Sequence, residues 1–375
     1  MLGDEIAAVR KLSYMPLCIL VGGRSVEHDS SLHMYYAFRR WAVSEKGNWH
    51  PNSFVAYLPL DGGVVLHDAS CAETFPADEF ALDGGERVSV SELLRRVQST
   101  STFVYSLLQG TEGEDGAFQG AATVCDIESN FGPVRPASIS ADKFVYSLFA
   151  ASLAIPELQQ VPTLRVTKGT SRSCVEKFLR EHTSDEIVIK PNDLGASVFC
   201  SRHKNLTYSA AATIWNEIFQ YTDCVLLQKL IIGTEYSHGC IQVGEDVVGL
   251  PSIKLLPRSG FLGQKEKFED GGYRAEVLSL DDPIHKLMAR VSHKLFVESA
   301  FANKARFDFI ANDLGLFLLE ANSQPGLTDE SHLSIMLNQV GLSVHDLVAL
   351  SAHNSRLRRK TLYTSRYDVT GTERD

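Results

Sequence analysis

Residues 304–328 read KARFDFIANDLGLFLLEANSQPGLT, and this stretch decides the fold. Its two apolar runs, 305–311 and 316–321, are separated by the turn residues 312–315. A turn signal between two short apolar runs predicts a pair of neighbouring strands. The polar residues that interrupt these runs then lie on a sheet, where the side-chain direction alternates along each strand.

Three polar residues in this stretch carry oxygen atoms of the kind that a hard cation prefers. Asp308 alternates with apolar residues on the first strand, and Glu320 and Asn322 lie two apart on the second, so both point to one face. If the strands pair, two carboxylates and one amide converge, which suits Mg²⁺ or, with similar chemistry, Mn²⁺. The alternative is a set of solvated surface residues. The apolar neighbours disfavour it, because they bury the strands and a buried carboxylate pair needs a cation.

Outward from this stretch, short apolar strands alternate with helical patterns, which predicts an open α/β sheet. The run 16–21 enters a glycine turn, and 103–108 is a second buried strand. The strands predicted at 186–191 and 198–201 are joined by a small-residue loop, which predicts a hairpin-like lid. The other predicted elements are helices at 30–41, 142–153, 283–301 and 343–351, strands at 53–60, 63–67, 224–232, 236–243 and 246–254, and an aperiodic loop at 257–274.

The whole chain has 375 residues, of which 44% are apolar and 22% charged. These values are ordinary for a globular protein of two or three domains. The formal net charge of -10 argues weakly against nucleic acid as the main partner. The longest apolar run near the start is too short to span a bilayer, and the first ten residues lack the order of a signal peptide. Seven scattered cysteines without a C-x-x-C pair indicate reduced thiols. We therefore expect a cytoplasmic protein with no membrane or nucleic-acid partner.

A second constellation consists of Lys143, Lys190 and Lys229, placed where predicted elements begin or end. A lysine at such a place can meet a phosphate while the N–H groups of residues 195–197 cover it. Glu235 comes just past Gly233 and could accept hydrogen bonds from the ribose hydroxyls. Each lysine alone fits an ordinary surface residue with a buried stem. Together with a magnesium patch they indicate a site for a nucleoside triphosphate, and the missing G-x-x-x-x-G-K-[ST] and G-x-G-x-x-G patterns argue against P-loop and dinucleotide folds.

A third feature is the acidic turn EGEDGAFQG at 112–120, just after the strand 103–108. Open α/β sheets place ligands at the carboxyl ends of their strands, so this turn is a candidate binding segment. By itself such a turn also fits a solvated connection.

Read together, these segments resemble the ATP-grasp superfamily, and specifically the D-alanine–D-alanine ligase family. The quoted pieces occur in the family's order over most of the chain. They are GGRSVEH at 22–28, GEDG at 113–116, QG at 119–120, ADK at 141–143, KP at 190–191, GASV at 195–198, QK at 228–229, GTE at 233–235, Arg306 with Asp308, and EANSQPGLT at 320–328.

The resemblance implies an ATP-grasp fold of three domains with the nucleotide between the central and C-terminal domains. The expected units are an N-terminal α/β domain at 1–140, a central lid subdomain at 141–233, a C-terminal catalytic domain at 234–355 and a polar tail at 356–375. The implied activity is ATP-dependent: the carboxylate of one amino acid is phosphorylated, and the amine of a second attacks the acyl phosphate. The family also implies amino-acid substrates and a homodimer.

On the nucleotide side, the resemblance assigns Mg²⁺ to the three oxygen-bearing residues named first. The remaining contacts would be shared among the phosphates, the adenine and the ribose. The residues implied are Lys143, Lys190, Lys267 and Ser197 for the phosphates, Lys229 and the backbone of Gln228 for the adenine, and Glu235 for the ribose.

On the substrate side, the resemblance places Glu27 at the first substrate's ammonium and Ser331 at the second substrate's carboxylate. Arg306 and the N–H group of Gly326 would stabilise the tetrahedral oxyanion. No covalent nucleophile from the protein is needed, because the lysines, Arg306 and the metal neutralise the two anions that must meet. The loop 257–274 would close over the site and exclude water from the acyl phosphate.

Several positions depart from the family pattern. Ala196 and Ser197 stand where the family has consecutive serines, and Phe199 replaces a glycine. Phe268 replaces a tyrosine in the loop, so only Glu27 is kept from the family's Glu–Ser–Tyr triad. The departures around the base and the substrates are Gln109 for a histidine, Gln228 for an acidic residue and His332 for an apolar residue.

Three hypotheses follow from the matches and the departures. The first is an ATP-dependent ligase of amino acids or dipeptides with non-standard substrates, because several pocket positions differ at once. The second is a true D-alanine–D-alanine or D-alanine–D-lactate ligase of cell-wall synthesis. The third is a nucleotide-binding protein that has lost catalysis, which the retained magnesium patch disfavours.

Overall fold

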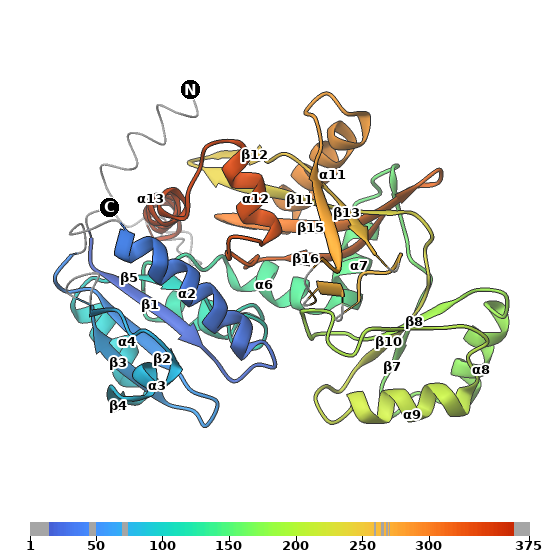
Figure 1. Cartoon of the computed structure of the whole chain (residues 1–375), viewed down its shortest axis with the longest axis horizontal. Helices are drawn as coiled ribbons and strands as arrows, with labels where there is room; N and C mark the ends of the chain where they lie inside the picture. Colours follow the sequence, from blue (N-terminus) through green and yellow to red (C-terminus); the bar gives the residue numbers. More distant parts are fainter. Residues whose placement is uncertain are drawn as a thin grey trace, which may run out of the picture.

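The structure, a computed structural model, describes residues 15–44, 50–69, 74–258, 260–263, 266–267, 269 and 271–363. Within these ranges the strands form three sheets of five, four and seven strands. The five-stranded and four-stranded sheets lie at opposite ends of the molecule, and the seven-stranded sheet lies between them (Figure 1).

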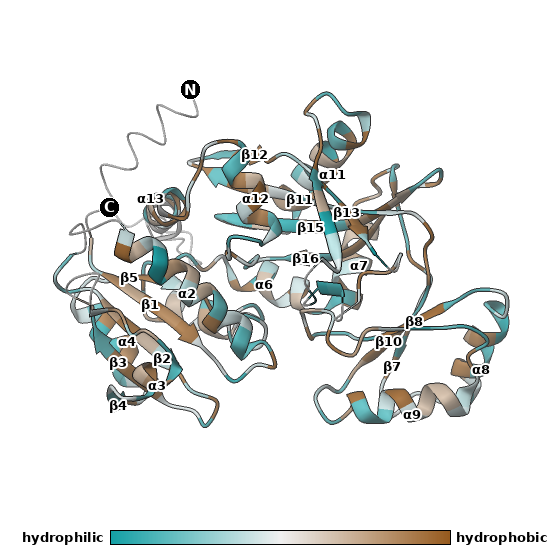
Figure 2. Ribbon diagram, in the orientation of Figure 1, coloured by the Kyte–Doolittle hydropathy of each residue, from teal (hydrophilic) through white to brown (hydrophobic). Residues whose placement is uncertain are grey.

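The N-terminal sheet has the strand order β4-β3-β2-β1-β5. Its strand β1 (Leu17–Gly22) is buried at every position and pairs in parallel with β2 (Phe54–Leu58) and β5 (Phe103–Ser106), as a central strand covered on both faces should. Figure 2 shows this strand in hydrophobic colours. It ends at Gly22, where φ is 92° and an added Cβ would collide with the Leu58 carbonyl oxygen, so only glycine fits. The other elements are β3 (Val64–Asp68), β4 (Glu86–Val88), α2 (His28–Ser44), α3 (Glu79–Asp83), α4 (Val90–Ser99) and α5 (Ala117–Val124).

The second sheet has the order β7-β10-β8-β9 and forms the lobe at the lower right of Figure 1. Strand β8 (Ile187–Pro191) pairs antiparallel with β10 (Val225–Lys229). Helices α8 (Arg172–Glu181) and α9 (Tyr208–Ile218) bury their apolar residues against these strands in a core of their own. The outer strands are β7 (Thr163–Val166) and β9 (Ser201–His203).

The third sheet is built around β11 (Thr234–Val243), β15 (Lys304–Asn312) and β16 (Gly315–Asn322), which pair antiparallel in that order. One face is covered by α7 (Lys143–Ser152) and α11 (Pro283–Ser299), whose apolar residues share a core with β15 and β16. A second core joins other residues of this sheet to the N-terminal sheet. The remaining elements are β6 (Leu158–Gln159), β12 (Asp246–Gly249), β13 (Ile253–Pro257), β14 (Tyr273–Val277), α6 (Val134–Ala141), α12 (His332–Gln339) and α13 (Val344–Tyr363).

Two strand predictions differ from the structure for local reasons. The chain does not extend at 198–201, because Ala196, Ser197 and Phe199 have positive φ and form turns, so β9 begins at Ser201. The single strand expected at 246–254 is divided into β12 and β13, with Pro251 between them, and proline cannot donate to a strand ladder.

The C-terminal segment also differs from the expectation. Residues 356–363, expected as the start of a polar tail, continue helix α13. Arg356 pairs with Glu128 at 3.1 Å, and Arg358 donates to the carbonyl of Phe131 at 3.0 Å, so two of the basic residues bind the N-terminal domain. The domain boundaries at 140 and 233 stay a prediction, and α7, within the expected central domain, packs on β16.

Candidate functional site

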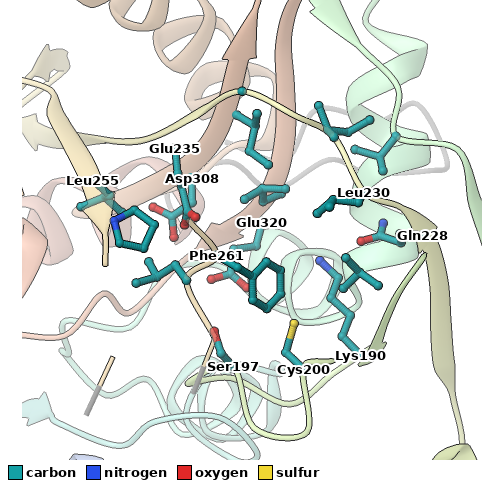
Figure 3. Close-up of a pocket in the computed structure, with 18 of the residues that line it drawn as sticks. Lys190, Ser197, Cys200, Gln228, Leu230, Glu235, Leu255, Phe261, Asp308 and Glu320 are labelled. Atoms are coloured by element: carbon teal, nitrogen blue, oxygen red, sulfur yellow. The ribbon is translucent and has the colours of Figure 1, made fainter. Parts of the chain in front are cut away.

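Two cavities meet beside β15 and β16. The first, of about 360 Å³, lies between the second and third sheets, and Figure 3 shows its lining. The second, of about 530 Å³, lies between α2 and the segment that follows β16. Lys267 and Glu320 border both cavities. A molecule in one cavity would therefore have direct access to a molecule in the other.

The predicted metal residues come together. Asp308 and Glu320 are register partners on β15 and β16, so their side chains leave the same face of the sheet. Asn322 is paired with Arg306 and lies on that face too, with its amide nitrogen 3.3 Å from Asp308 Oδ2. Pairing the two strands thus brings three oxygen-bearing side chains to one patch.

The carboxylates of this patch are held in the charged form. Burial opposes ionisation of Asp308, but its ion pair with Arg306, at 2.7 Å, outweighs that effect and lowers the pKa. Burial also opposes ionisation of Glu320, and the nearby Lys143 and Lys267 more than offset it, so this pKa is lowered as well. Two carboxylates are therefore anionic in a buried place, where the oxygens of Asp308 accept hydrogen bonds from Arg306, Ser237 and Asn322.

The donor set fits a divalent cation. Among the described residues no three His, Cys, Asp or Glu side chains gather as a metal site, so binding would depend on the two carboxylates and the Asn322 amide. Such an all-oxygen set with few protein ligands suits Mg²⁺, which usually keeps water and phosphate oxygens in its shell.

The predicted phosphate residues lie at the charged end of the first cavity. Lys190 reaches it from β8, and burial lowers the pKa of its ammonium. Its backbone pairs with β10, but its ammonium has no hydrogen bond or ion pair with another described residue and is therefore free to bind an anion. Lys143, at the start of α7, donates to the carbonyl of Leu194 at 2.8 Å and lies 3.6 Å from Glu320. Ser197 lines the same end from the turn of the lid loop.

The other end of the first cavity is largely apolar. Gln228 and Lys229 line it from the end of β10, and the Lys229 ammonium is held by Asp185 at 3.1 Å. Glu235, on β11, also lines the cavity and lies beside Asp308 (Figure 3), and burial raises the pKa of its carboxyl to about 7. An apolar lining and a set of lysines in one cavity would suit the base and the phosphates of a nucleotide.

The lid loop reaches the N-terminal domain at Glu27. An added Cβ on Gly195 would collide with the Glu27 carboxylate, and one on Gly110 would lie 2.7 Å from its Oε2. Glycine at both positions therefore lets two loops close around this carboxyl group. Burial raises the pKa of Glu27, and Lys143 opposes that shift.

Glu27 lines the second cavity together with most of the predicted substrate residues. Gln109 donates to the carbonyls of Leu108 and Gln324, at 3.1 and 2.9 Å, which turns its amide nitrogen away from solvent. Ser331 and Gly326 also line this cavity, and Ser331 begins helix α12. Phe268 lies outside the described residues.

His332 lies in the second cavity within a chain of hydrogen bonds. Ser237 donates to Asp308 at 2.5 Å, so its oxygen accepts from Nδ1 of His332 at 3.0 Å. The other ring nitrogen then accepts from the Tyr273 hydroxyl at 3.2 Å. Burial and the nearby Arg306 lower the pKa of His332 to about 3, so the ring is neutral.

Sequence reasoning missed several residues of this site. Ser237 and Tyr273 have no motif of their own, and only the strand register places Ser237 opposite Asp308. Lys304 is almost fully buried and donates to the side chain of Gln324 at 2.6 Å beneath the second cavity. Burial lowers the pKa of Lys304 to about 8. The signal in the sequence that could have identified Lys304 is that a lysine stands in a strand at a position where the alternation predicts an apolar residue.

The described part of the chain has no helix that is both long and apolar enough to cross a membrane. Residues 150–350 match the family described as "D-ala D-ala ligase C-terminus", which is more than half of the chain.

Solved structures of that kind share the fold. A D-alanine–D-alanine ligase from Coxiella burnetii superposes with a TM-score of 0.71 at 17% identity, covering 92% of this chain and 97% of the other. One from Bacillus anthracis, complexed with ATP, gives 0.67 at 17% identity, with 92% and 99% covered. The VanG D-Ala:D-Ser ligase from Enterococcus faecalis gives 0.67 at 16% identity, with 91% and 99% covered. With the family match over residues 150–350 and this shared α/β fold, the chain belongs to the D-alanine–D-alanine ligase family of ATP-grasp proteins.

Proposed function

We propose that this protein is an ATP-dependent carboxylate–amine ligase that joins two amino acids, or an amino acid and a related amine, through an acyl phosphate. The observation that carries the proposal is the shared border of the two cavities. Lys267 and Glu320 line both, so a nucleotide's terminal phosphate in one cavity would lie beside a carboxylate in the other. Positioning two such anions supplies much of the rate enhancement in phosphoryl transfer.

In the first step, an oxygen of the first substrate's carboxylate attacks the γ-phosphorus of ATP, and ADP leaves. Lys143, Lys190 and Lys267 would neutralise the phosphate charge, and Glu235 would accept from the ribose hydroxyls. A divalent cation held by the patch of Asp308, Glu320 and Asn322 would add positive charge at the phosphate oxygens.

In the second step, the amine of the second substrate attacks the acyl carbon, loses a proton, and inorganic phosphate leaves. Glu27 would bind the first substrate's ammonium, and Ser331 the second substrate's carboxylate. Arg306, whose Nε and Nη2 bind Asp308, lines the second cavity and would, with the Gly326 N–H, stabilise the oxyanion.

We further propose that the substrates differ from the two alanines of the family's standard reaction. The second cavity, at about 530 Å³, extends to polar residues of α2, including His33 and Arg40. Gln109 and His332 line it where the family has a histidine and an apolar residue. A pocket of this size and polarity supports larger or more polar substrates than alanine.

The test is incubation with ATP, Mg²⁺ and a panel of L- and D-amino acids, hydroxy acids and β- or γ-amino acids, with phosphate release and product mass as readouts. We expect ADP, phosphate and a condensed product with at least one pair. A dipeptide from D-alanine alone would select the cell-wall ligase instead. ATP binding without turnover on any pair would support a non-catalytic homologue.

A further inference from the structure

The first cavity, which we call the nucleotide cavity, has the polar side chain of Gln228 at the end where a base would lie. That end is walled largely by apolar residues. The apolar lining consists of Val161, Val188, Leu230, Ile231 and Ile310. Gln228 borders this apolar end, and Figure 3 shows its side-chain oxygen directed into the cavity.

An amide can turn either its oxygen or its nitrogen to a ligand, so its orientation decides what it recognises. Gln228 and Thr163 are register partners on β10 and β7, and Nε2 of Gln228 lies 2.8 Å from Oγ1 of Thr163. The Thr163 hydroxyl has a single proton, which it donates to the carbonyl of Val161 at 2.8 Å. Its oxygen can therefore only accept from Gln228, which leaves Oε1 of Gln228 for the cavity.

We propose that Thr163 is a positioning residue that fixes the Gln228 amide so that Oε1 selects a 6-amino purine over a 6-oxo purine. This inference rests on the proposed nucleotide site and states which purine base that site prefers. The exocyclic amine of adenine donates to Oε1, whereas the oxygen of a 6-oxo purine would face it lone pair to lone pair. The ammonium of Lys229 does not assist the 6-oxo base, because Asp185 holds it.

The experiment compares the binding of the β,γ-imido analogues of ATP and ITP, measured by calorimetry with Mg²⁺ and without amino acids. ITP isolates the 6-position, since it lacks the 2-amino group of guanine. We expect the wild-type protein to prefer the ATP analogue. Thr163→Val keeps the shape of the side chain but lets the amide rotate, and it should reduce the ATP-to-ITP affinity ratio roughly two- to tenfold, the net value of one hydrogen bond.

Two further variants separate positioning from a general structural effect. Thr163→Ser retains the hydroxyl and should keep the wild-type ratio. Gln228→Glu, added to Thr163→Val, should restore the ratio, because a carboxylate accepts from either oxygen and needs no orientation. Gln228→Leu tests the acceptor directly and should lower the ratio by a similar factor even if the valine variant folds poorly.

The outcomes distinguish this inference from the proposed function. Equal wild-type affinity for the two analogues, or an unchanged ratio in Thr163→Val or in Gln228→Leu, would overturn the inference while the nucleotide site stands. Binding of neither analogue to the wild-type protein would overturn the nucleotide site, and the proposed function with it.

Discussion

The two cavities that meet at Glu320 are built in different ways. The nucleotide cavity is lined mostly by strand residues, such as Lys190 on β8 and Glu235 on β11. These two charged side chains reach the cavity because each lies near the end of its strand. The second cavity, which we call the substrate cavity, is assembled from α2, the turn after β5, the lid loop and the segment between β16 and α12. Its polar groups are oriented by partners far away in sequence, as Gln109 is by Gln324.

This difference explains where the chain departs from its family. If every member binds the same triphosphate, a substitution in the nucleotide cavity has to preserve the binding of that ligand. We infer that Gln228 does so by accepting a hydrogen bond from the base. The substrate cavity has no such fixed ligand. On the proposed function, changes at Gln109 and His332 would alter what this pocket accepts without disturbing the strands that carry the proposed phosphate residues.

The largest expected effect is at the residue that the two cavities share. Glu320→Gln removes the charge that faces Lys143 and the proposed cation, so we expect phosphate release to fall by at least about a hundredfold with the fold intact. Glu245→Gln, at the exposed turn after β11, is the matched control and should keep wild-type activity. Full turnover by the Glu320→Gln variant would show that Glu320 is not part of the catalytic site.

A smaller effect should be confined to the nucleotide cavity. Lys190→Ala removes a buried ammonium that has no partner among the residues that the structure describes, and we expect ATP binding to weaken by about 1.5–3 kcal/mol, the range of a charge-assisted hydrogen bond. Lys177→Ala, on the exposed side of α8, should leave ATP affinity unchanged. Unchanged affinity of the Lys190 variant in calorimetry would place the phosphates elsewhere.

A change in the substrate cavity should affect the binding of the amino-acid substrate and leave the binding of ATP unchanged. His332→Leu introduces the apolar residue type of the family and removes the partner of both Ser237 and Tyr273. We expect the KM of the amino-acid substrate to change roughly threefold to tenfold, the range of one or two hydrogen bonds, with the KM of ATP nearly constant. An equal shift in both constants would contradict the separation of the cavities.

The smallest effect concerns pH. Burial raises the pKa of Glu235 to about 7, so its carboxyl is neutral below that pH and ionised above it. A carboxylate accepts from ribose hydroxyls better than a carboxylic acid, so ATP affinity should fall by at most roughly tenfold between pH 8 and pH 6. Glu235→Gln should flatten this profile. A wild-type profile that is already flat would show that Glu235 does not face the ribose.

Much of this arrangement follows from the sequence. The alternation at 305–311 and 316–321 predicts the β15–β16 pair, and the spacing of Glu320 and Asn322 predicts their common face. The positions of Lys190 and Glu235 at strand ends follow from apolar runs that stop at charged residues. These predictions succeed because strand periodicity is a local property of the chain.

Contacts between segments that are far apart in the sequence could not be predicted, because the pattern of residues along one segment does not show which other segment lies beside it. Ser237 bonds Asp308, 71 residues away, and Gln109 bonds Gln324, 215 residues away. The orientation of the Gln228 amide depends on Thr163, which lies 65 residues before it.

The sequence by itself determined the strands, the charged residues at their ends and the family to which the chain is similar, because these depend on residue type and spacing. Only the tertiary structure decided how the side chains are oriented: which nitrogen of His332 carries the proton, which atom of Gln228 faces the cavity and how closely Gly195 approaches Glu27. The physical reason is that a hydrogen bond fixes direction only when both partners are in place, and the partners here come from segments that are far apart in the sequence.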